Sequence, residues 1–124
     1  MKRMTMKTKS VLLLVVCLNL GACATNNNQI YHWGSYETLL YNMYNKPGKA
    51  TPEIQIAEMN TDLQKATKPQ PPGFYAHLGT MYAAAGNLSE ALAAFELEKA
   101  NFPESSILVD GMIKRATSTA GDAQ

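Results

Sequence analysis

The segment from Tyr75 to Pro103 places the tightest limits on how this chain can fold. Large apolar residues recur in it at helical spacing, and two very small residues, Gly79 and Ala91, stand among them. Small side chains let two helices approach closely, while large neighbours fill the seam around the contact. Gly86 can adopt the positive φ that ends a helix, and the final proline prevents continuation of the second helix. The segment therefore predicts two packed helices joined by a turn.

The same segment closely resembles a tetratricopeptide repeat, a helix-turn-helix unit of about 34 residues. The residues that match the repeat-packing positions of that family are Tyr75, Leu78, Gly79, Tyr82, Gly86, Ala91, Phe95 and Pro103. Glu98 departs from the pattern, because the family usually has Ala at that position, and this places close packing against a following helix in doubt. A single repeat cannot bury both of its faces, so the resemblance implies further helices on either side.

Two helices are predicted before this segment. Apolar residues at i, i+3, i+4, i+7 spacing indicate an amphipathic helix that begins after a capping Ser35 and stops at "NKPGKAT". Thr51 and a following proline restart a helix, and "KPQPPG" ends it. Counting 34 residues back from the second repeat helix and its final proline gives Ala57 and Pro69, so residues 35–69 resemble a degenerate repeat.

One capping helix is predicted after the repeat. The residues expected on its packed side are Ile107, Leu108, Met112 and Ala116. Five helices result, so the expected fold is all-α, a short tetratricopeptide-like array over residues 31–118 followed by a flexible tail over 119–124.

Residues 1–22 have the layout of a signal peptide. Four basic residues precede the apolar run "SVLLLVVCLNL", which is shorter than the 20 or so apolar residues that cross a bilayer. The run ends in "LGAC", which closely resembles the lipobox of bacterial lipoproteins. The resemblance implies that the Cys23 thiol receives diacylglycerol, that the chain is cut before it, and that the new amine is acylated. The alternatives are an ordinary cleaved signal peptide or an uncleaved anchor, with Cys23 in the core.

The residue after the lipobox cysteine predicts the membrane. In the enteric sorting rule an Asp there retains a lipoprotein in the inner membrane, so Ala24 points to the periplasmic leaflet of the outer membrane. Residues 23–30 then form a lipidated N-terminus and short polar tether. Cleavage leaves seven Lys and Arg against ten Asp and Glu, a net charge of about −3, and no basic patch for nucleic acid. It also leaves no second cysteine for a disulfide.

The sequence offers no catalytic constellation. The two histidines, His32 and His77, are not joined by other ligands at metal-binding spacing, so no metal site is predicted. We expect His77 to be a partly exposed helix residue, and we leave His32, next to a tryptophan, as a weaker candidate for partner contact. Glu96 and Glu98 are two residues apart on a helix and do not face each other. We therefore predict that the protein is not an enzyme and has no cofactor besides the lipid on Cys23.

The segment "YHWGSYETLLY" is the candidate partner-binding surface. Trp and Tyr dominate interface hot spots, so Tyr31, Trp33 and Tyr36 are candidate contacts. The alternative is that Trp33 and Tyr36 seal the end of a small core. Together with the lipobox and repeat, the segment resembles a family of small proteobacterial outer-membrane lipoproteins of unknown function.

That resemblance implies an envelope assembly, with a partner that is another envelope lipoprotein or a protein similar to a secretion channel. We expect an interaction adaptor anchored to the outer membrane. The alternatives are a pilotin-like factor that localises a secretion-channel lipoprotein and a module that binds cell wall or small peptides.

Overall fold

The computed structural model describes residues 28–122, and Cys23 and Ala24 lie outside this range. Five α-helices follow one another within this range, which contains no strand, so the predicted all-α fold is confirmed. The helices are α2 (Tyr36–Asn45), α3 (Pro52–Lys65), α4 (Phe74–Ala84), α5 (Leu88–Asn101) and α6 (Ser106–Asp122). Two 3₁₀-helices, η1 (Pro47–Lys49) and η2 (Pro103–Ser105), precede α3 and α6.

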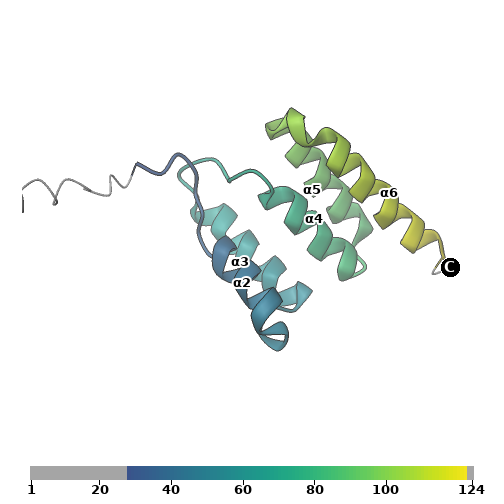
Figure 1. Ribbon diagram of the computed structural model, residues 1–124, viewed down its shortest axis with the longest axis horizontal. Coiled ribbons are helices and arrows are strands. Elements are labelled where there is room, and N and C mark those ends of the chain that lie inside the picture. Colours follow the sequence, from purple (N-terminus) through teal and green to yellow (C-terminus); the bar gives the residue numbers. More distant parts are fainter. Residues whose placement is uncertain (1–27, 123–124) are drawn as a thin grey trace, which may run out of the picture.

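The helices form a short array in which neighbours in sequence are neighbours in space. α4, α5 and α6 lie side by side, and α3 packs on α4 from the other side (Figure 1). α2 lies next to α3 and contacts α4 as well, through Tyr36 and Phe74. No helix within residues 28–122 combines the length and the hydropathy that a membrane span requires.

Local sequence signals set the helix ends. Thr51 Oγ1 accepts a hydrogen bond from Ile54 N–H, and Pro52 occupies the first turn of α3. Gly86 has a φ of +81° in the turn after α4. Ser35 precedes α2, but it does not cap the helix with its own hydroxyl, because that hydroxyl donates to Asp62 Oδ2 at 2.6 Å. The start of α2 is therefore bound by the Asp62 carboxylate of α3, and the capping predicted for the Ser35 side chain is wrong.

The closest helix contact is between α4 and α5. A Cβ added to Gly79 would lie 2.7 Å from the Phe95 ring and 3.0 Å from Ala91 O, so only glycine fits there. Leu78, Ala91 and Phe95 are buried around this contact, while Tyr75 and Tyr82 are half-buried beside it. Pro103 lies after α5, at the start of η2.

The core consists of two clusters on either side of that contact. One cluster joins α2, α3, α4 and α5, and its buried members are Tyr36, Leu39, Met59, Phe74, Leu78 and Ala94. The other joins α4, α5 and α6, and its buried members are Ala76, Ala91, Phe95 and Val109. α4 and α5 contribute to both clusters and so form the centre of the array.

The register predicted for the first pair of helices is wrong. Ala57, which is 34 residues before Ala91, is exposed on α3. The buried residues of α3 are Gln55 and Met59, which lie 36 residues before Ala91 and Phe95. The two pairs therefore correspond with a spacing of 36 in their second helices.

The packed face predicted for α6 is partly wrong. Val109 is fully buried, and Met112, Ile113 and Ala116 pack beside it, whereas Ile107 and Leu108 are exposed. α6 also continues through residues 119–122, where the sequence predicts a flexible tail.

Candidate functional site

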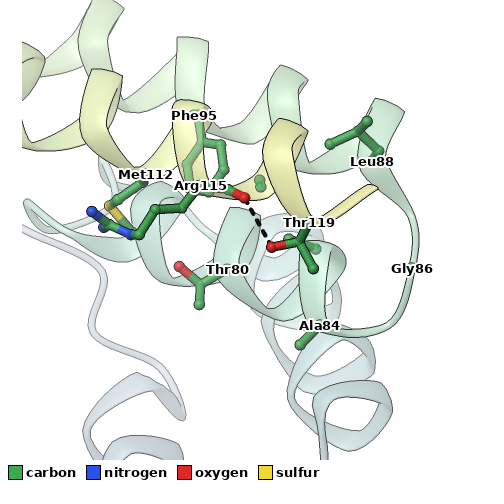
Figure 2. Close-up of a pocket in the computed structure, with 10 residues that line it drawn as sticks. Thr80, Ala84, Gly86, Leu88, Phe95, Met112, Arg115 and Thr119 are labelled. Atoms are coloured by element: carbon green, nitrogen blue, oxygen red, sulfur yellow. Dashed lines mark hydrogen bonds between the residues drawn. The ribbon is translucent and has the colours of Figure 1, made fainter. Parts of the chain in front are cut away.

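A groove lies between α4 and α6, over α5, and is shown in Figure 2. Its volume is about 740 Å³. Three helices and the turn after α4 line it with Thr80, Ala83, Ala84, Gly86, Leu88, Phe95, Met112, Arg115, Ala116 and Thr119. It is the candidate functional site because it is a concave, mainly apolar surface of the kind in which ligands and peptide segments bind.

The groove exists because small residues stand on both of its walls. Ala83, Ala84 and Ala116 carry a single side-chain carbon, and Gly86 carries none. Phe95 packs against the close contact of α4 with α5, so its ring is held in place at the groove. The space between α4 and α6 is therefore left open by the sequence and is shaped by well-packed helices.

Few polar groups face the groove. The Thr80 hydroxyl donates to Ala76 O at 2.9 Å, and the Thr119 hydroxyl donates to Arg115 O at 3.0 Å, the bond drawn in Figure 2. Both hydroxyl protons are thus used within their own helices, and the oxygens can only accept. Arg115 is exposed and supplies the cationic donors of the groove. This set can bind an apolar segment together with an anionic or acceptor group.

Glu98 has a structural role that sequence reasoning missed. It is 1% exposed, and its carboxylate accepts hydrogen bonds from Gly73 N–H at 2.7 Å and Ala76 N–H at 3.3 Å. These N–H groups belong to the first turn of α4, where a helix offers no internal partner. The carboxylate of α5 therefore caps α4 and interacts favourably with its dipole. The available signal was Gly73 before α4, a position with no capping side chain.

Asp62 has the same role for α2. Its Oδ2 accepts from both Ser35 N–H, at 2.8 Å, and Ser35 Oγ, at 2.6 Å. Gly34 passes directly beside this carboxylate, because an added Cβ would lie 2.5 Å from Asp62 Cγ. Both carboxylates are engaged at helix ends, so neither is placed to act in chemistry.

His77 joins α4 to α3. Gln55 Nε2 donates to Ala50 O at 2.8 Å, so Gln55 Oε1 is left to accept from His77 Nε2 at 2.7 Å. Burial lowers the pKa of His77 below its ordinary value of 6.5, because the charged ring would lose its hydration. The neutral ring thus serves as a hydrogen-bond donor between two helices, and it is partly exposed, as predicted.

The three aromatic candidates are in different environments. Tyr36 is buried in the core, stacks with Trp33 and meets Phe74 edge-on, so it is a core residue and not a binding contact. Burial raises its pKa, and the carboxylate of Glu98 adds to the effect. Trp33 is half-buried against the core, and Tyr31 is half-buried with its ring 6.3 Å from that of Phe102.

The described residues hold no group of three or more His, Cys, Asp and Glu side chains that could bind a metal ion. His32 is half-buried, and its Nε2 has no hydrogen-bond partner within residues 28–122. Its backbone N–H donates to Pro69 O at 2.8 Å, which ties the start of the described chain to the loop before α4.

Comparison with known proteins gives one family. No curated protein and no solved structure shows a significant match to the chain. One family model, the domain of unknown function DUF4810, matches residues 30–112, from the segment before α2 to the middle of α6. The match spans every contact described above except the last turns of α6, and the chain belongs to this family of unknown function, DUF4810.

Proposed function

We propose that the protein is a membrane-tethered adaptor, in which a lipid on Cys23 fixes the location and the groove between α4 and α6 binds a segment of another envelope protein. The observation that carries the proposal is the groove itself, an open apolar space of about 740 Å³ over the rigid contact of α4 with α5. The resemblance of residues 75–103 to a tetratricopeptide repeat supports a protein ligand, because such arrays bind peptide segments.

The proposed location is the periplasmic leaflet of the outer membrane. It is supported by the order of basic residues, apolar run, lipobox and Ala24 in the sequence. Mass spectrometry of the protein extracted from membranes tests the anchor. We expect a chain that begins at Cys23 and carries the mass of diacylglycerol and an N-acyl group, and a chain with an unmodified Cys23 would contradict it.

A groove-filling substitution tests the binding site. Ala84→Leu places a branched side chain in the groove, and Ala93→Leu places the same side chain on the exposed face of α5 away from it. Both alanines are exposed in helices, so the two variants are matched in substitution and exposure. We expect envelope proteins that copurify with the wild-type chain to be lost with Ala84→Leu and retained with Ala93→Leu. An unchanged set of copurified proteins with Ala84→Leu would contradict binding in the groove.

A further inference from the structure

One end of the array contains the point at which the described chain begins. Residues 28–35, here called the strap, run beside the loop of residues 66–73, since His32 N–H donates to Pro69 O and Lys68 Nζ donates to Gln29 O. Tyr31 contacts Phe102, so the turn between α5 and α6 lies next to the strap as well. We call this end, made of the strap, the loop 66–73 and residues 102–108, the tether end (Figure 1).

The tether end carries the most exposed aliphatic side chains of the described residues. Ile107 is 90% exposed, Ile30 is 72% exposed and Leu108 is 63% exposed. Ile107 and Leu108 lie in the first turn of α6, and Ile30 lies in the strap. Tyr41 and Tyr44 are also exposed on α2, but they carry hydroxyl groups that water can solvate. The exposed aliphatic residues elsewhere, Leu97 on α5 and Ile54 on α3, are covered to a greater extent, with 49% and 43% exposed. Exposed aliphatic residues have no such compensation, so the presence of the three most exposed ones at this end favours a partner there.

The chain length before the strap limits what that partner can be. Cys23 precedes Gln29 by six residues, and a chain of that length spans at most about 20 Å when fully extended. This step rests on the lipid anchor of the proposed function. With the lipid in the bilayer, the tether end is the part of the domain held against the membrane surface.

The charges at the tether end are balanced. Lys68 and Glu104 are exposed within it, and Lys65 and Glu37 are exposed on the adjacent ends of α3 and α2. Asp62 and Glu98 are occupied at the starts of α2 and α4, and Asp110 pairs with Lys99 at 2.7 Å. A surface without net charge gains little from anionic lipids, so its contact with a bilayer would be apolar and would depend weakly on salt.

We propose that the tether end rests on the phospholipid bilayer, with Ile30, Ile107 and Leu108 entering the headgroup region. The occupant of this surface is the membrane that carries the protein's own lipid. Contact there orients the array, so that the groove on α4 and α6 keeps a fixed direction relative to the bilayer.

Tryptophan reporters in the lipidated full chain test the contact. Trp33 is the only tryptophan of the chain, so a Trp33→Phe background allows a single reporter to be introduced. Ile107→Trp places it at the tether end, and Tyr44→Trp places it on α2, at a position that is 78% exposed, as the matched control. The proteins are reconstituted into phosphatidylethanolamine and phosphatidylglycerol vesicles with and without brominated acyl chains, and their mass is measured to establish lipidation.

We expect brominated lipid to quench Ile107→Trp emission severalfold more than Tyr44→Trp emission, at low and high salt alike. Equal quenching of both reporters in a lipidated protein would overturn the membrane contact and leave the anchor intact. Ile107→Trp emission that is shielded from aqueous iodide but not quenched by lipid would place a second copy of the chain on this surface and also overturn the proposal. A chain without lipid on Cys23 would instead contradict the anchor, and the membrane contact with it.

Discussion

The two helix pairs of the array, α2 with α3 and α4 with α5, share one device and differ in how they are packed. In each pair the start of the first helix is bound by a carboxylate of the second, Asp62 in α3 and Glu98 in α5. Each carboxylate is the eleventh residue of its helix. The seam between the helices is different, because α4 meets α5 at Gly79 and Ala91, whereas Gln55 stands in α3 at the place of Ala91.

The difference shows which pair depends on the other. α4 and α5 make a close apolar contact between themselves. α3 joins α4 through the apolar cluster that contains Met59, and hydrogen bonds add to this contact. They link Gln55 to His77, and Asn60 Nδ2 donates to Tyr82 Oη at 2.9 Å. The first pair therefore relies on the surface of the second, and we expect the second pair to dominate the stability of the domain.

We expect the largest change in stability when the capping carboxylates are removed, and a larger loss for Glu98 than for Asp62. Glu98→Ala leaves the half-buried Gly73 N–H and the buried Ala76 N–H without partners and opens a cavity, so it should lower the free energy of unfolding by about 3 kcal/mol. Asp62→Ala removes a half-buried cap and should cost about 1 kcal/mol. Urea unfolding followed by circular dichroism measures both. Equal losses would show that the two caps contribute equally to stability, which contradicts the expected dominance of the second pair.

We expect the second-largest change in stability at the close contact between α4 and α5. Gly79→Ala places a methyl group against the Phe95 ring and Ala91 O, so overpacking should cost about 2 kcal/mol. Gly111→Ala is the control, since its nearest neighbour would be Arg115 Nη1 at 3.5 Å and alanine favours a helix by about 0.5–1 kcal/mol. Thermal unfolding should therefore move in opposite directions for the two variants. A Gly79→Ala protein as stable as the wild type would show that the contact of α4 with α5 leaves room for a methyl group, and would contradict close packing there.

The hydrogen bond between His77 of α4 and Gln55 of α3, which joins the two pairs, gives the smallest effect on stability, and that effect depends on pH. Because burial lowers the folded pKa of His77, the unfolded chain takes up a proton near pH 6.5 while the folded chain resists it. The stability from the neutral ring is complete above pH 6.5 and is lost as the pH falls below it. Urea midpoints of His77→Gln should fall less steeply below pH 6.5 than those of the wild type. An unchanged slope in the variant would mean that the His77 ring is not the group responsible.

Much of the fold was predictable from local patterns. Each helix boundary depends on a few neighbouring residues, such as Gly86 in the turn after α4 or Thr51 and Pro52 at the start of α3. These signals and the proline-rich loops account for the five helices of residues 28–122. The packed face of α6 was not predictable in the same way. The terminal helix has apolar residues on two sides, and only the position of α5 decides that Val109 is buried and Ile107 is exposed.

The site was less predictable than the fold. In the sequence the small residues Ala83, Ala84 and Ala116 indicate only a helix. They line a groove because α5 holds α4 and α6 apart, and this arrangement depends on the tertiary fold. Tyr36 is of a residue type that is frequent in binding sites, but its position one turn from Leu39 places it in the core. The capping by Glu98 joins residues 25 apart, and no short-range pattern indicates that pairing.

Site-specific photo-crosslinking in intact cells tests the adaptor function most directly. A photo-crosslinking phenylalanine analogue replaces Thr119, which is exposed and lines the groove, and in a second protein it replaces Ala57, which is exposed on α3 away from it. We predict a discrete adduct with one envelope protein from the Thr119 position and none from the Ala57 position. The absence of any adduct from the groove, or the same adducts from both positions, would contradict the account.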